Sequence, residues 1–144
     1  AIDYPNRVIS AYATGGQTAS MFSFLASNGD IVGTIKSTVS STSFNTSSDY
    51  RLKENVVAMT GATERLKRLN PSRFNFIADA DVTVDGFLAH EVADVVPEAI
   101  TGTKDAVDDD GNAVYQGIDQ SKLVPLLVAT IQELEARVTQ LENN

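Results

Sequence analysis

The chain has 144 residues, no cysteine and a formal net charge of -8. Without cysteine, neither a disulfide framework nor a thiolate metal site can form, and the acidic balance argues against nucleic-acid binding, because phosphates would be repelled. No apolar run approaches the roughly 18 to 20 residues that a membrane-spanning helix needs, so no membrane span is predicted.

The charge is distributed unevenly along the chain. Residues 1–48 carry two acidic and two basic side chains, so the whole net charge lies in residues 49–144. A shift in composition of this kind indicates two regions of different character. We therefore expect a β-rich region before position 48 and a separate acidic domain after it, at the end of a longer protein.

The first region has the composition of short β-strands. Small, β-branched and aromatic residues favour strands near 7–13, 19–26 and 31–36. The pair Asn28-Gly29 separates the last two of these segments, and Asn-Gly between apolar runs is a strong hairpin signal. Three short strands bury little apolar surface, so this region is expected to need partner chains.

Residues 37–48 are Ser or Thr at nine of twelve positions. Such a composition is typical of a flexible linker. A threonine-rich segment also suits an extended strand that wraps about a trimer axis. Both interpretations put Ser48 at the end of an extended segment.

The second region mixes helical and strand patterns. A short helix is predicted over 62–69, where an Asn-Pro pair ends it. Alternating residues predict strands over 73–77 and 82–89, and a helical turn over 90–96 is closed by proline. This sequence of elements predicts an α+β fold.

The acidic run at 108–111 looks at first like a calcium-binding loop. With Gly111 at the glycine position of an EF-hand, the first ligand position falls on Ala106 and the closing glutamate position on Gly117. Neither residue has a carboxylate, so no metal site and no cofactor are predicted. The run is interpreted as a polar hairpin turn before a strand at 112–115.

The last segment carries the clearest helical pattern. Apolar residues recur there at alternating spacings of three and four, which indicates a coiled-coil seam. The seam residues are Val124, Leu127, Ile131, Leu134, Val138 and Leu141. We expect a helix over about 121–142. Its start, widened by Leu123, Leu126 and Val128, should pack on the globular body, and its tail should join other copies. The mixture of β-branched and leucine residues favours a parallel trimer.

Ser48 and Lys53 form the pattern with the most chemical content. A serine hydroxyl needs a base to become a nucleophile, and a lysine can serve where burial or a neighbouring cation, such as Arg51, lowers its pKa. Residues five apart lie roughly 140° from each other on a helix and on opposite faces of a strand. The chain must therefore turn within 49–52, or a neighbouring subunit must supply the lysine.

The run at 48–53, Ser-Asp-Tyr-Arg-Leu-Lys, resembles the signature of the intramolecular chaperone domains that end phage tailspikes, endosialidases and tail fibres, the S74 family of self-cleaving peptidases. Three further features match in order from there to the C-terminus, and the resemblance as a whole runs from about Phe22. They are the pattern Leu66-x-x-Leu69-Asn70-Pro71-x-x-Phe74, the segment Gly86-Phe87-Leu88-Ala89-His90-Glu91-Val92 followed by Pro97, and the terminal heptad helix.

The resemblance implies a catalytic dyad of Ser48 and Lys53 and a cut between Ser47 and Ser48. Asp49 and His90 are candidate helpers, and a satisfied core histidine is an equally weighted interpretation of His90. The donors for the oxyanion of the reaction cannot be named from sequence.

The implied organisation is a β-structured end of a trimeric fibre stalk at 1–47 and a small mixed α/β chaperone domain at 48–144. The implied partners are two further copies of the chain and its own upstream stalk, in a virion whose fibre assembles in the bacterial cytoplasm. A permanent, non-catalytic trimerisation and receptor-binding tip is the rival hypothesis. Animal membrane-tethered transcription factors carry a related domain, but neither a membrane span nor a basic DNA-binding region is predicted here.

Overall fold

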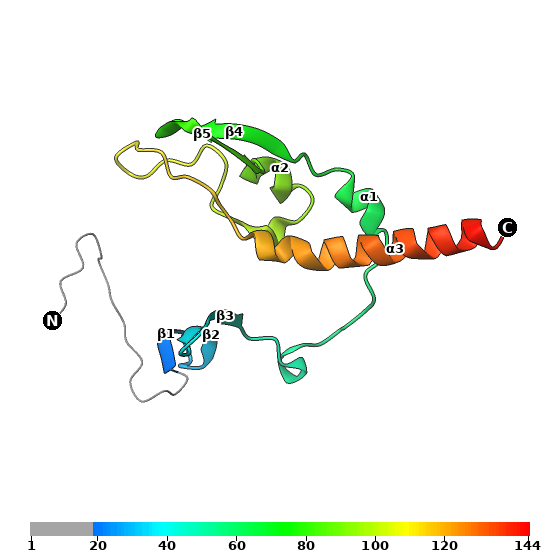
Figure 1. Ribbon diagram of the computed structural model, residues 1–144. Coiled ribbons are helices and arrows are strands. Elements are labelled where there is room, and N and C mark those ends of the chain that lie inside the picture. Colours follow the sequence, from blue (N-terminus) through cyan, green and yellow to red (C-terminus); the bar gives the residue numbers. More distant parts are fainter. Residues whose placement is uncertain (1–18) are drawn as a thin grey trace. The chain divides into compact units, whose positions relative to one another are not determined.

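The computed structural model describes residues 19–144 (Figure 1). The chain divides into two compact units, Ala1–Val56 and Val57–Asn144. The strand predicted near 7–13 lies outside the described residues. The division between the units lies on the C-terminal side of the predicted cut after Ser47. Ser48 and Lys53 therefore both belong to the first unit. The domain boundary proposed at 47/48 is the position at which the chain is expected to be cut, and it stays a prediction.

The first unit contains a three-stranded antiparallel sheet in the order β1-β2-β3 (Figure 1). Its strands are β1 (Ala19–Leu25), β2 (Ile31–Ser37) and β3 (Thr42–Thr46). The predicted Asn-Gly turn joins the first two. Gly29 has φ 89 there, a conformation that glycine adopts without steric cost, and its N–H donates to the carbonyl of Ala26 at 2.9 Å.

The Ser- and Thr-rich segment 37–48 folds back on β2. The hydroxyl of Thr38 accepts the N–H of Ser41 at 3.0 Å, which tightens the reversal. β3 then pairs with β2 from Ser37↔Thr42 to Gly33↔Thr46. Over 42–46 the segment is therefore a paired strand and not a flexible linker.

The second unit is a small mixed α/β domain, and the predicted α+β class is confirmed. In Figure 1 its β4–β5 hairpin lies on the side away from the long helix α3. The elements in chain order are α1 (Ala62–Leu66), β4 (Ser72–Phe76), β5 (Asp79–Gly86), α2 (Ala89–Ala93), the 3-10 turn η2 (Pro97–Ala99), β6 (Ile100–Thr101), β7 (Gly117–Ile118), the 3-10 turn η3 (Gln120–Leu123) and α3 (Val124–Glu142).

The core of the second unit forms where α1, α2, η2 and the start of α3 meet. The buried hydrophobic residues are Ala62, Val92, Val95, Val96, Ala99, Leu123 and Leu126. Leu66, Leu69, Phe87, Ile100, Ile118 and Ala129 pack against them. The β4–β5 hairpin contributes no fully buried side chain, so the helices and η2 hold the unit together.

Glu133 of α3 caps the N-terminus of α1. Gly61 precedes this helix and has no side chain with which to satisfy the first free N–H groups. The Glu133 carboxylate accepts the backbone N–H groups of Ala62 and Thr63, each at 2.8 Å, and the Thr63 hydroxyl at 2.6 Å. The bond from the Thr63 hydroxyl, followed by those two backbone bonds, lowers the pKa of Glu133 to about 2.

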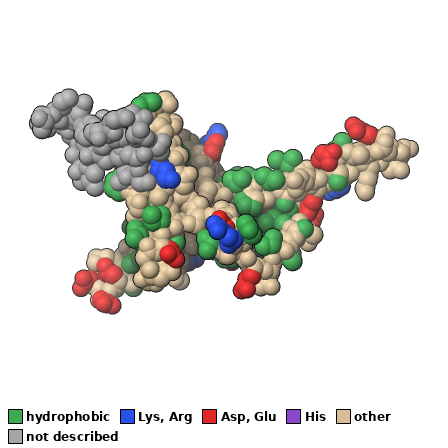
Figure 2. Space-filling model, turned by 90° about the horizontal axis from the view of Figure 1, so that it is seen from below, with side chains coloured by type: hydrophobic (Ala, Val, Ile, Leu, Met, Phe, Trp, Pro, Cys, Tyr) green, Lys and Arg blue, Asp and Glu red, His purple; other side chains and the backbone are tan. Residues whose placement is uncertain are grey.

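α3 occupies most of the predicted C-terminal helix, whose first residues form η3 instead. Leu123 and Leu126 are buried as predicted, whereas Val128 is 48% exposed in the single chain. The predicted seam residues are 43% to 77% exposed. Figure 2 shows hydrophobic side chains uncovered at the base of the projecting helix. The seam is thus free to contact another molecule.

The acidic run at 108–111 forms the predicted turn. The carboxylate of Asp108 accepts the N–H groups of Asp110 and Asn112 at 3.0 and 2.8 Å, and Gly111 has φ 82. The strand expected at 112–115 is reduced to one bridge, Val107↔Ala113. Over residues 19–144, no group of three or more acidic or histidine side chains is arranged to hold a metal ion. No helix in that range is long and apolar enough to cross a membrane.

Candidate active site

A single 3-10 turn, η1 (Tyr50–Leu52), follows β3 and shapes the candidate site. Asp49 precedes the turn in an extended conformation, and its carboxylate accepts the N–H of Arg51 at 2.9 Å. The N–H of Lys53 donates to the carbonyl of Tyr50 at 3.1 Å and closes the turn. The chain therefore reverses within 49–52, which is one of the two arrangements that the spacing of Ser48 and Lys53 allowed.

The turn brings the two predicted dyad residues together. The Nζ atom of Lys53 donates a hydrogen bond to Oγ of Ser48 at 2.8 Å. Both side chains come from the same chain, and both are exposed. A serine and a lysine at hydrogen-bond distance have the geometry of a nucleophile and its base. When the lysine is neutral, the same contact can carry a proton from oxygen to nitrogen.

Asp49 binds Arg51 and not the dyad. Its two carboxylate oxygens accept Nε and Nη2 of Arg51 at 2.9 and 2.8 Å. The Arg51 side chain, and after it the Arg51 backbone N–H, lowers the pKa of Asp49. Arg51 is therefore not the free neighbouring cation expected beside Lys53, because its guanidinium is paired with this carboxylate. Asp49 consequently builds the turn that presents Lys53.

Ser47, on the other side of the predicted cut, is held by β2. Its N–H donates to the carbonyl of Val32 at 2.9 Å, and its hydroxyl donates to the carbonyl of Ile31 at 3.2 Å. Sequence reasoning did not identify these two carbonyl groups as part of the site. The register of β3 on β2 determines them, and a run of similar Ser and Thr residues does not specify a register.

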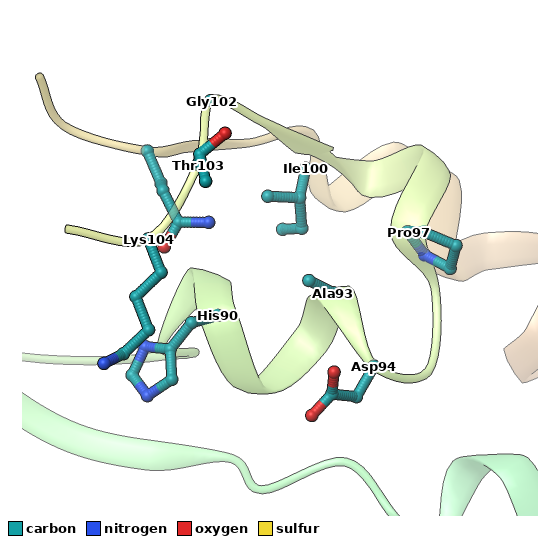
Figure 3. A pocket seen from close by; sticks show the side chains of 9 residues that line it. His90, Ala93, Asp94, Pro97, Ile100, Gly102, Thr103 and Lys104 are labelled. Carbon is teal, nitrogen blue, oxygen red and sulfur yellow. The ribbon is translucent and has the colours of Figure 1, made fainter. Parts of the chain in front are cut away.

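His90 belongs to the second unit. It is half-buried on α2 and lines an open pocket of about 470 Å³. Figure 3 shows its imidazole beside Lys104, with Asp94 and Pro97 elsewhere on the rim. Within the described residues its side chain forms no hydrogen bond, and both interpretations of His90, as a helper of the dyad or as a structural histidine, stay predictions. The structure brings Ser47, Ser48, Asp49 and Lys53 together within the first unit, and the proposed helper role of His90, in the second unit, stays a prediction.

Residues 48–101 match the model of the protein family Peptidase_S74, described as chaperone of endosialidase. This part of the chain belongs to the chaperone-of-endosialidase family. The match begins at Ser48, the first residue after the predicted cut. It covers the motif at 48–53, the helix α1, the β4–β5 hairpin and α2.

Two phage proteins are similar to the chain over 100 residues, at 33% identity. They are the long tail fiber protein Gp37 of Enterobacteria phage K3 and that of Enterobacteria phage T2. The aligned part is 67% of this chain but only 8% and 7% of those two proteins. Together with the family match, these relatives support a tail-fibre chaperone role and a location in the virion tail.

Proposed function

We propose that the chaperone-of-endosialidase domain trimerises and aligns the chains of a phage tail fibre or tailspike, and then releases itself by autoproteolysis between Ser47 and Ser48. Ser48 is the nucleophile and Lys53 its base. The observation that carries the proposal is the 2.8 Å contact between Ser48 Oγ and Lys53 Nζ within one chain. Its support is the coincidence of this contact with the start of the family match at residue 48.

The proposed reaction begins when the Ser48 hydroxyl gives its proton to the neutral amine of Lys53. The Ser48 oxygen bonds to the carbonyl carbon of Ser47, the bond from that carbon to the Ser48 nitrogen breaks, and the nitrogen takes up the proton. Water then hydrolyses the ester between the two serines. The products are a carboxylate end at Ser47 and a free amino end at Ser48.

The slow assembly of a trimeric β fibre explains why a chaperone domain would be needed and later removed. A β fibre of three chains depends on contacts between distant segments, so its strands align slowly and pair wrongly with ease. The exposed seam of α3 offers a surface on which three helices can associate in parallel and bring the stalk ends into register. Removal of the cap then leaves the assembled stalk kinetically trapped.

The second candidate function is a permanent, non-catalytic trimerisation and receptor-binding tip. It is favoured by the exposure of both dyad side chains in the single chain, because catalytic groups act most strongly in a site from which water is excluded. Trimer formation would have to cover the dyad for the first proposal to operate. The two functions differ in whether the chain is cut.

Mass spectrometry and a denaturing gel of freshly folded protein test the proposal. We expect fragments of 47 and 97 residues, the second starting at Ser48. Ser48→Ala and Lys53→Ala should each leave full-length chains that still fold, because both side chains are exposed and, among residues 19–144, their side-chain hydrogen bond is to each other. Full-length wild-type chain under all folding conditions would favour the permanent tip, and a normal cleavage rate in either variant would refute the dyad.

A further inference from the structure

We propose that Ser47 is a positioning residue that holds the scissile carbonyl on β2, so that cleavage depends on the correct register of β3 against β2. The inference rests on the proposed self-cleavage and adds a condition to it. The cut would then report that the end of the stalk sheet has formed properly before the cap is released.

Two hydrogen bonds fix Ser47 to the first two residues of β2. The backbone N–H reaches the carbonyl of Val32 and the hydroxyl reaches the carbonyl of Ile31, at 2.9 and 3.2 Å. They extend the β2–β3 ladder by one residue beyond its last pair, Gly33↔Thr46. With both of its donors engaged on one strand, Ser47 has little freedom to turn its own carbonyl group, which is the proposed electrophile.

The residues after the cut are held separately. Asp49 caps η1, and η1 carries Lys53 to Ser48. The bond between Ser47 and Ser48 is thus the link between a residue fixed by β2 and a residue fixed by the turn. Reaction requires the nucleophile and the carbonyl carbon to meet in a narrow range of geometries, so both attachments contribute to the rate.

The sequence around the cut allows β3 to pair with β2 in more than one register, so a reaction that depends on the correct register would be useful. Thr46, Ser47 and Ser48 all carry a hydroxyl, so a slip by one residue would place a similar side chain beside Val32. Such a slip also turns every β3 side chain to the opposite face. In that arrangement Ser48 or Thr46 would occupy the anchor position, and the carbonyl of Ser47 would no longer be held in place by β2. Because every β3 side chain is exposed in the single chain, packing within the chain would distinguish these registers poorly, whereas cleavage would distinguish them well.

The first test compares cleavage rates after the start of refolding. Ser47→Ala removes the bond to Ile31 and should slow cleavage about threefold to tenfold, the effect of one lost hydrogen bond. Ser47→Thr keeps a hydroxyl and should restore most of the rate. Ser43→Ala is the matched control, because the Ser43 hydroxyl accepts from Asn45 in its own strand and does not reach β2; its rate should equal that of the wild type.

A second variant loosens the same pairing without changing Ser47. A Cβ atom at position 33 would lie 3.1 Å from the backbone oxygen of Asn45 and 3.5 Å from the ring of Phe24. Gly33→Val must therefore push β3 away from β2 just before the anchor. We expect a loss in cleavage rate larger than that of Ser47→Ala, with the helical signal of the second unit unchanged.

Amide hydrogen exchange at Ser47, measured in a Ser48→Ala background that stays uncut, shows how firmly the anchor holds in each variant. Faster exchange should accompany slower cleavage across the set. If Ser47→Ala cuts at the wild-type rate, or if cleavage does not follow exchange, the positioning role is wrong while self-cleavage stands. If the wild-type chain never cuts, both proposals fail.

Discussion

The two units differ in how much of their structure a single chain can bury. Every buried hydrophobic side chain among the described residues lies in the second unit, where helices converge on one core. In the sheet of the first unit Thr34 is the buried residue, and Phe24 and Phe44 are 54% and 78% exposed. The helical core is closed by contacts within the second unit, whereas the sheet leaves apolar side chains exposed in the single chain.

This difference is consistent with separate roles for the two units, association for the second and cleavage for the first. The second unit has a buried core of its own, and its exposed α3 seam is the surface proposed to join three copies. The first unit contains the Ser48–Lys53 pair. If this unit is stabilised by the proposed association, cleavage should follow assembly, because the segment to be cut would be ordered last.

The largest effect is expected from the core of the second unit. Leu126 is 2% exposed on α3, and Leu126→Ala should lower the free energy of unfolding by about 2 to 5 kcal/mol. Its neighbour Leu127 is 44% exposed on the seam, so Leu127→Ala should cost less than about 1 kcal/mol at concentrations where the chain is monomeric. Urea denaturation followed by helical circular dichroism, in a Ser48→Ala background, measures both. Equal losses would mean that the seam is part of the core.

The next effect concerns assembly. Leu134→Asp puts a carboxylate in the proposed trimer seam, and the desolvation it suffers there should weaken association at least about tenfold, with a matching loss of cleavage. Ala136→Asp adds the same charge to the same helix away from the seam and should change neither. Sedimentation equilibrium compares the two variants with the wild type, for which a monomer or dimer would refute the trimer.

The elements that the sequence predicted correctly have local signals. The Asn28-Gly29 hairpin, the acidic turn at 108–111 and the α3 periodicity each depend on residues within a few positions of one another. The sequence predicted that Ser48 and Lys53 act as a pair. It left open whether a turn within 49–52 or a neighbouring subunit brings the lysine to the serine. Asp49 as a turn residue favoured that arrangement.

The contacts that sequence reasoning missed join distant segments. Glu133 caps α1 from 70 residues away, and Ser47 bonds to a carbonyl 16 residues earlier. Nothing near Glu133 distinguishes it from the other exposed acidic residues of α3. The anchor of Ser47 depends on the register of β3 against β2. Nine of the twelve residues at 37–48 are Ser or Thr, and such a uniform segment does not specify one register. Both contacts appear only once the packing of whole elements is known.

A smaller effect is expected from acid, and it falls on the second unit. The pKa of Glu133 is lowered to about 2 in the folded chain, against an ordinary value of 4.5. Its contribution to stability is therefore complete above pH 4.5 and is lost progressively as the pH falls toward 2. Glu133→Gln should be less stable than the wild type at pH 7, and the two melting curves should converge near pH 2.

Glu135→Gln is the control for this experiment, because it removes the same charge from the same helix at a carboxylate that accepts from Thr139 of α3 and not from the N-terminus of α1. Its melting temperature should stay close to that of the wild type at pH 7. A constant difference between Glu133→Gln and the wild type from pH 7 to pH 2 would show that the carboxylate does not cap α1 in its ionised form.

Co-expression of Ser48→Ala chains with Lys53→Ala chains shows whether the Ser48–Lys53 dyad works within one chain. In such mixed trimers one kind of chain has the nucleophile and the other has the base, so a cut requires a site shared between subunits. Because Ser48 Oγ and Lys53 Nζ meet within a single chain, we expect no cut product, with trimers confirmed by sedimentation and the wild-type chain cutting beside them. A 97-residue product starting at Ser48 in the mixed trimers would contradict it.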